Sequence, residues 1–145
     1  MNQVCFDASA ACAFALDDEP YHPQALALVA ALAKREARII APPIFLCECD
    51  STIRMRVYKG ALNEGEADQA RQFSAALAVA IDHAMIYDRA FEIARIYNQP
   101  RTYDATYAAL AELRGVELWT VDKRFYNAAQ STLPFVRFIG NYGHG

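Results

Sequence analysis

The sequence predicts an α/β domain of three layers, in which a short, mainly parallel central sheet is flanked by helices. Short apolar segments, several of them rich in β-branched residues, alternate along the chain with longer segments that carry small apolar residues at helical spacing. The chain of 145 residues is 54% hydrophobic and 21% charged, a balance typical of a globule with a core. Because no linker, repeat or low-complexity segment divides it, we expect a single domain over residues 1–145.

The expected elements alternate between strand and helix from the start of the chain. Pro20 ends the first helix, and Pro23 lies near the start of the second. Asn63 is expected to cap a later helix, and Gly115 to end the helix before the strongest strand. Strands are expected at 4–6, 38–41, 79–81, 117–121 and 135–139, and helices at 8–16, 24–35, 44–58, 64–77, 84–97, 103–113 and 123–130.

The sequence also predicts which side chains are buried and which segment is loose. Trp119, in the strongest strand, is expected in the core, and the tail from about residue 140 to 145 is expected to be loose. The predicted apolar faces are Leu26, Val29, Ala30 and Ala33 in the second helix, Ile44, Cys47, Ser51 and Met55 in the third, and Ala67, Ala70 and Phe73 in the fourth.

Composition and charge narrow the class of protein. No apolar stretch approaches the roughly 18 residues that a membrane helix needs, and the first residues lead into a strand rather than a signal peptide, so a cytoplasmic location is expected. The four cysteines lack the spacing of a zinc site, and we expect buried thiols in a reducing compartment. The net charge of -3 does not favour nucleic-acid binding, although an acidic metal site would itself lower this sum.

Four acidic residues occupy positions that favour a common site. Asp7 directly follows the first strand and Asp122 the strongest one, while Asp104 opens a helix and Glu48 lies inside another. Functional groups in parallel α/β sheets gather beyond the carboxyl ends of the strands. Each acid has apolar neighbours, among which an unpaired carboxylate is costly. A divalent cation would neutralise the cluster, and Mg²⁺ and Mn²⁺ prefer carboxylate and water oxygens.

Each of these acids also has a simpler interpretation. Asp7, Asp104 and Asp122 each lie at the start of a helix and could cap it. Glu48 could be an ordinary surface glutamate. Asp50 falls on another face of the same helix as Glu48 and is expected at the surface or behind the site.

Four segments resemble the motifs of the PIN-domain ribonucleases, and in particular the VapC-type toxins of toxin–antitoxin systems. Residues 4–10 resemble the opening motif, in which a hydrophobic run precedes Asp-x-Ser, and Pro42 followed by Glu48 is similar to the second motif. Residues 103–112 resemble the third motif, and residues 118–125 the fourth, Thr-x-Asp followed by a basic pair. The resemblance extends from residue 4 to about residue 139. Ser51 departs from it, because the family often has Asn at this position.

The resemblance implies a PIN-like fold and a Mg²⁺- or Mn²⁺-dependent endoribonuclease acting on tRNA or mRNA. It implies that Asp7, Glu48, Asp104 and Asp122 are both the metal ligands and the catalytic residues, with bound water as the nucleophile. A carboxylate that the metal does not fully engage would orient that water or act as the base. The resemblance also implies a homodimer and a small antitoxin protein that occupies the active-site groove.

Further residues are candidates for supporting roles. Ser9 and Thr120 are expected to hydrogen-bond the ligating carboxylates, or else to be a capping serine and a strand threonine. Tyr103 and Tyr107, which flank Asp104, are expected to pack in the core, with base stacking as the second interpretation. The residues that could hold RNA phosphates, or be plain surface charges, are Arg101, Lys123 and Arg124.

Two other functions compete with this interpretation. A Mg²⁺-dependent phosphatase of the haloacid dehalogenase type wants a second Asp two residues after the first, and Ser9 stands at that place after Asp7. A PIN-like module that binds RNA or protein without cutting is the other alternative. The complete set of four acids argues against it, because a site without chemistry has no need of them.

Overall fold

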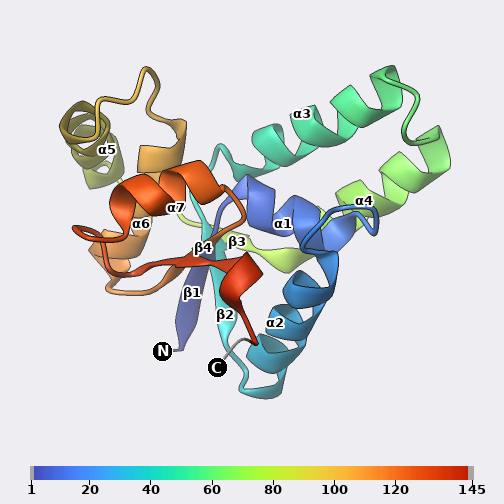
Figure 1. Ribbon diagram of the computed structural model, residues 1–145, viewed down its shortest axis with the longest axis horizontal. Helices are drawn as coiled ribbons and strands as arrows, with labels where there is room; N and C mark the ends of the chain where they lie inside the picture. The colour runs from blue at the N-terminus through green and yellow to red at the C-terminus, as the bar shows by residue number, and fades with distance from the viewer. Residues whose placement is uncertain (1, 144–145) are drawn as a thin grey trace.

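The computed structural model describes residues 2–143 and places a parallel five-stranded sheet between helices, which confirms the predicted three-layer α/β fold (Figure 1). The strand order is β3-β2-β1-β4-β5, and every neighbouring pair is parallel. The strands are β1 (Gln3–Phe6), β2 (Arg38–Ala41), β3 (Val79–Ala80), β4 (Leu118–Thr120) and β5 (Val136–Phe138). The helices are α1 (Ala8–Ala15), α2 (His22–Lys34), α3 (Phe45–Tyr58), α4 (Glu64–Leu77), α5 (Met85–Ile96), α6 (Tyr103–Arg114), α7 (Lys123–Ala129) and the 3₁₀ helix η1 (Ile139–Asn141).

The strand order creates a switch point between β1 and β4. From β1 the chain adds β2 and β3 on one side, and it then returns through α5 and α6 to place β4 on the other side of β1. Helices that leave the two neighbouring strands in opposite directions open a crevice beyond their carboxyl ends, where ligands bind in such folds. Asp7 directly follows β1, and Asp122 comes two residues after the end of β4.

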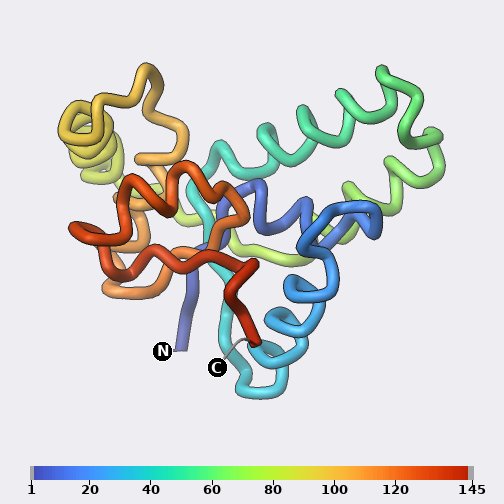
Figure 2. The backbone as a smooth tube through the Cα atoms, in the orientation of Figure 1, coloured from blue at the N-terminus to red at the C-terminus, as the bar shows by residue number. Residues whose placement is uncertain are grey.

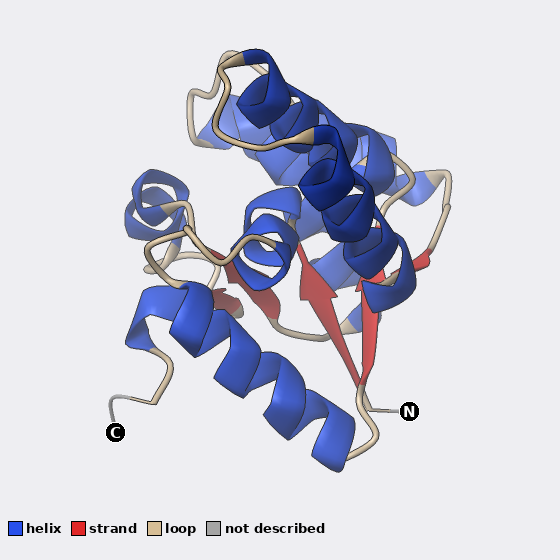
Figure 3. Cartoon of the chain, turned by 90° about the vertical axis from the view of Figure 1, so that its right-hand side faces the viewer, coloured by secondary structure: helices blue, strands red, loops and turns tan. Residues whose placement is uncertain are grey.

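The sheet is covered on both faces, as Figure 3 shows with helices on either side of the strands. Successive side chains of a strand point to opposite faces. Cys5 therefore belongs to one core cluster, with residues of α3, α5 and α6, and Phe6 to the other, with residues of α2 and η1. A parallel sheet buried on both faces has near-continuous apolar strands, which is why the short strands were recognisable in the sequence.

Two of the predicted apolar faces are wrong by a rotation of the helix. In α2 the buried residues are Ala25, Leu28 and Leu32, while Leu26 is 44% exposed. In α3 they are Phe45, Cys49 and Ile53, while Met55 and Cys47 are exposed. Both helices carry apolar residues around much of their circumference, so spacing alone does not select the face that packs.

The helices α3 and α4 form a hairpin that extends from the body of the domain, shown in green in Figure 2. Asn63 begins α4 with a capping box, in which its side chain accepts from Glu66 N–H and the Glu66 carboxylate accepts from Asn63 N–H. Ala67 and Ala70 are buried as predicted, but Phe73 is 45% exposed, with its ring edge against Phe14.

Within residues 2–143, no helix is long and apolar enough to cross a membrane.

The chain end differs from the predicted loose tail. Residues 139–141 form η1, in which Ile139 is fully buried. The Tyr142 ring packs edge-on against Trp119, with the ring centroids 5.8 Å apart. Trp119 is half-buried beneath this contact rather than deep in the core. Residues 144–145 lie outside the described part of the chain.

A candidate metal centre at the switch point

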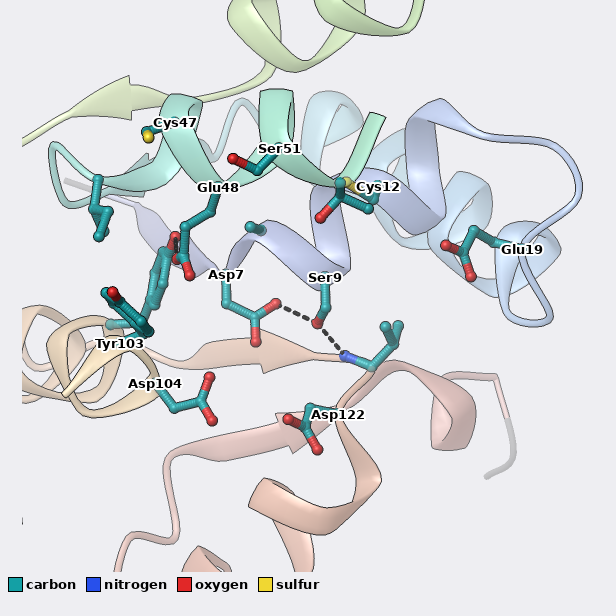
Figure 4. A pocket seen from close by; sticks show the side chains of 15 residues that line it. Asp7, Ser9, Cys12, Glu19, Cys47, Glu48, Ser51, Tyr103, Asp104 and Asp122 are labelled. Atoms are coloured by element: carbon teal, nitrogen blue, oxygen red, sulfur yellow. Dashed lines mark hydrogen bonds between the residues drawn. The ribbon is translucent and has the colours of Figure 1, made fainter. Parts of the chain in front are cut away.

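The structure brings the four predicted acids to one pocket of about 490 Å³. Asp7 lies between β1 and α1, and Asp122 lies between β4 and α7. Glu48 belongs to the first turn of α3 and Asp104 to the first turn of α6. Figure 4 shows their carboxylates directed into a common space between α1 and α3 on one side and α6 and α7 on the other.

All four acids lie at helix N-termini, where the helix dipole favours negative charge. The Asp7 side chain caps α1 by accepting from Ala10 N–H at 2.8 Å, and the Asp122 side chain caps α7 by accepting from Phe125 N–H at 3.0 Å. Capping is therefore correct for these two residues, and it fixes the direction of each carboxylate. Asp104 has no such role, because α6 begins after Thr102.

Hydroxyl groups connect the two acids that follow the strands. Ser9 Oγ donates to Asp7 Oδ1 at 2.7 Å and accepts from Val121 N–H at 3.1 Å, as the dashed lines in Figure 4 show. Thr120 Oγ1 accepts from Asp122 N–H at 2.9 Å and lies 3.3 Å from Ser9 Oγ. Ser9 and Thr120 thus bridge the ends of β1 and β4 and hold Asp7 and Asp122 in a fixed relation.

The acids carry more negative charge than their surroundings balance. Burial raises the pKa of Asp7 to about 6. Burial, followed by repulsion from Asp7, Asp122 and Glu48, raises the pKa of Asp104 to about 7. Within residues 2–143, no lysine or arginine forms an ion pair with any of the four. Asp50, by contrast, pairs with Arg71 at 3.0 Å and lies outside the pocket, as its position on another helix face predicted.

The donor set fits a hard, hydrated cation better than a closed cage. Over residues 2–143, no three His, Cys, Asp or Glu side chains are close enough to hold a metal ion directly as they stand. Mg²⁺ keeps several of its waters and is commonly bound through one or two carboxylates plus phosphate oxygens of the substrate, so it does not need such a cage. A spread set of carboxylate oxygens facing one space meets this requirement, with Asp7, Glu48, Asp104 and Asp122 as the candidate ligands.

Tyr107 contacts one of the four acids, which the sequence did not predict. Its side chain is 1% exposed, so it packs as predicted, but its hydroxyl also donates to Glu48 Oε1 at 2.5 Å. Tyr107 lies three residues after Asp104 on the same face of α6, which places both side chains toward α3. The i, i+3 spacing from Asp104 is the signal that could have suggested a role in the site.

We expect Tyr107→Phe to weaken binding of Mn²⁺ by about 10-fold while the protein remains folded, because outer partners that orient a ligand typically contribute 10- to 100-fold to metal affinity. Isothermal titration calorimetry measures the effect. Tyr126→Phe is the matched control, since that ring stacks on Phe138 away from the acids. Equal Mn²⁺ affinity in the Tyr107 variant and the wild type would contradict a positioning role.

Other predicted residues lie around the pocket at different distances. Ser51 lines the pocket, at a position where the family that the sequence resembles often has Asn. Arg101 and Arg124 line an adjoining pocket, whereas Lys123 is exposed and lines neither. The buried-thiol expectation fails at Cys47, which is exposed, and holds for the other three cysteines. Further lining residues that the sequence did not reveal are Cys12, Glu19 and Thr52.

A parallel sheet with carboxylates gathered beyond the ends of β1 and β4 defines an α/β domain with an acidic site at its switch point. The sequence model of the PIN domain matches residues 4–130, which extend from β1 through α7, and the chain belongs to the PIN-domain family. PIN domains are in general metal-dependent nucleases. A comparison with curated proteins found no match to this chain.

Proposed function

We propose that this protein is a Mg²⁺- or Mn²⁺-dependent endoribonuclease that acts as the toxin of a type II toxin–antitoxin pair. One observation supports the catalytic part most strongly. Four carboxylates from distant segments face one space without a basic partner among residues 2–143, and their repulsion contributes to raising the pKa of Asp104 to about 7. Such a cluster is destabilising unless a cation occupies it, and the cation is what phosphodiester hydrolysis needs.

When bound, the cation would polarise the scissile phosphate and make a bound water more acidic. The chain's own residues supply position. Asp7 and Asp122 form the rigid side of the site, because helix capping and the hydroxyl bridge fix them. Glu48, held by Tyr107, and Asp104 form the opposite side. A carboxylate that the cation does not fully engage would orient the attacking water or accept its proton.

The test is cleavage of a mixed pool of tRNA and mRNA by the purified protein with Mg²⁺, with Mn²⁺ and with EDTA. We expect cleavage only with metal, and a loss of at least about 100-fold in Asp7→Asn, since that change removes a group that acts in the transition state. Asp50→Asn is the control, because Asp50 is a nearby carboxylate that pairs with Arg71 outside the pocket.

A folded protein that neither cleaves RNA nor binds Mn²⁺ in calorimetry would overturn the proposal and favour a PIN-like module that binds without cutting. Cleavage that persists in EDTA or in Asp7→Asn would point to a contaminating ribonuclease. A haloacid dehalogenase type of phosphatase gains no support from the site, since Ser9 occupies the place of its second acid and hydrogen-bonds Asp7.

The toxin role brings two partners, a small antitoxin and a second copy of the chain. Large apolar side chains on the surface favour the presence of a partner. Tyr58 is 78% exposed, Phe91 68%, Met85 63% and Ile96 59%. Light scattering of the purified protein, whose chain mass is 16.1 kDa, tests the second copy directly.

A further inference from the structure

A second pocket of about 560 Å³ adjoins the acid cluster on the side of α6 and α7. The two pockets share Glu48, Tyr103, Asp104 and Asp122, so the second opens directly onto the candidate metal centre. Its volume is in the range of small-ligand sites, which are about 300–1,000 Å³. The rest of its wall comes from the segment before α6 and from α7, and consists of Tyr97, Asn98, Gln99, Pro100, Arg101, Arg124, Phe125 and Ala128.

The two pockets differ sharply in charge. The first is lined by no lysine or arginine and by five acidic residues, Asp7, Glu19, Glu48, Asp104 and Asp122. The second contains both Arg101 and Arg124. Neither guanidinium forms an ion pair within residues 2–143, although three carboxylates line the same pocket. Of the residues that line these two pockets, the positively charged ones therefore all belong to the second, where they can hold an RNA phosphate.

The second pocket also offers a surface suited to a nucleobase. Tyr103 is 47% exposed and lies where the two pockets meet, next to Asp104. An exposed aromatic ring is a stacking platform for an unpaired base. Asn98 and Gln99 add polar groups to the wall of the same pocket.

We propose that this Arg101–Arg124 pocket binds one nucleotide of a single-stranded RNA, adjacent to the phosphate that is cleaved. The base stacks on Tyr103, and Arg101 and Arg124 hold the phosphate on the far side of the base from the acids. The inference rests on the proposed nuclease function and names the residues that hold the nucleotide next to the cleaved phosphate. Because a base inside a duplex cannot reach a side pocket without unstacking, loops and unpaired ends are the preferred substrates.

The test is fluorescence anisotropy of a labelled single-stranded RNA hexamer with the full chain in EDTA, which keeps the RNA intact. The double variant Arg101→Ala/Arg124→Ala and the single variant Tyr103→Ala are each expected to bind at least about fivefold more weakly, since one stacked base or two phosphate contacts are worth at least that factor. Tyr103→Phe keeps the ring and is expected to bind within about twofold of wild type. The same hexamer in a perfect duplex is expected to bind at least about fivefold more weakly than the single strand.

The matched control is Arg95→Ala/Arg114→Ala, which removes the same charge from two exposed arginines that line neither pocket. An equal loss in this control would show that bulk charge, not the pocket, binds RNA, and would overturn the inference. Unchanged binding in Tyr103→Ala would do the same. The assay needs neither metal nor cleavage, so its outcome is separate from the nuclease test. Pocket-dependent binding without cleavage retains the pocket and overturns the nuclease, whereas cleavage with pocket-independent binding does the reverse.

Discussion

Asp104→Asn is expected to make the metal-free protein more stable at pH 8 while abolishing metal-dependent cleavage. Burial and three neighbouring carboxylates hold the pKa of Asp104 at about 7, against an ordinary value of 3.8. At pH 8 the folded protein therefore carries a charge that its surroundings oppose. Asparagine keeps the shape of the side chain and removes that charge, so we expect a gain of about 1–2 kcal/mol in the free energy of unfolding, allowing for partial exposure of the group.

Thermal unfolding in EDTA at pH 8 measures the gain, which corresponds to a rise of about 3–6 °C in Tm for a chain of this size. Asp50→Asn is the control with the opposite expectation, because it breaks the pair with Arg71 and gains nothing. A lower Tm in Asp104→Asn than in the wild type would show that the fold stabilises the charged carboxylate and would contradict a raised pKa of Asp104. Opposite changes in stability and activity are characteristic of functional groups held against their preferred state.

The metal-free protein is expected to lose stability as the pH rises from about 5 to about 8, and Mn²⁺ to restore it at the upper end. The folded pKa values of Asp7 and Asp104 are about 6 and about 7, above the value of 3.8 for an unperturbed carboxyl group. At pH values between the unperturbed pKa of 3.8 and these raised pKa values, the folded state binds more protons than the unfolded state, so the free energy of unfolding falls with increasing pH. Their contribution is fully present below about pH 4 and is lost as the pH passes through 6 and 7.

A divalent cation reverses this trend because it binds the ionised carboxylates. Mn²⁺ at about 100 times its dissociation constant adds about 2.7 kcal/mol, and we expect the rise in Tm to be larger at pH 8 than at pH 5. Differential scanning fluorimetry across this pH range, with and without Mn²⁺, measures both effects. In the double variant Asp7→Asn/Asp104→Asn the slope in EDTA and the response to Mn²⁺ should both largely disappear. A slope that survives in this variant would place its origin outside the acid cluster.

The order of strands and helices could be predicted from the sequence because each strand and each helix has a local pattern of residues. The short apolar runs of a doubly covered sheet and the turns at Pro20, Asn63 and Gly115 mark the elements directly. The buried faces of α2 and α3 could not be predicted from spacing. Each helix carries apolar residues on several sides, and only the packing of the folded chain selects the side that is buried. The docking of Tyr142 on Trp119 is likewise a contact between distant segments, with no local signal.

The same distinction applies to the site. Asp7 and Asp122 were expected together because each follows a parallel strand, and the carboxyl ends of parallel strands share one edge. The hydrogen bond from Tyr107 to Glu48 joins residues 59 positions apart on two helices, so their meeting depends on how α3 and α6 pack. The Arg101–Arg124 pocket depends in the same way on the placement of α7 beside the segment before α6.

The pairing of β1 with β4 has a consequence for synthesis of the protein. The strands β1 and β4 are neighbours in the sheet, with Cys5 beside Leu118 and Phe6 beside Trp119. The two acids that follow these strands, Asp7 and Asp122, therefore come from distant parts of the chain. While the protein is being translated, the early segments hold Asp7 and Glu48 but no partner strand on that side of β1. The acid cluster is complete only after β4 has joined the sheet, so a nascent or prematurely ended chain that lacks β4 and α7 also lacks Asp122 and one side of the site. The proposed toxin activity would therefore begin only after β4 and α7 have been synthesised and have packed.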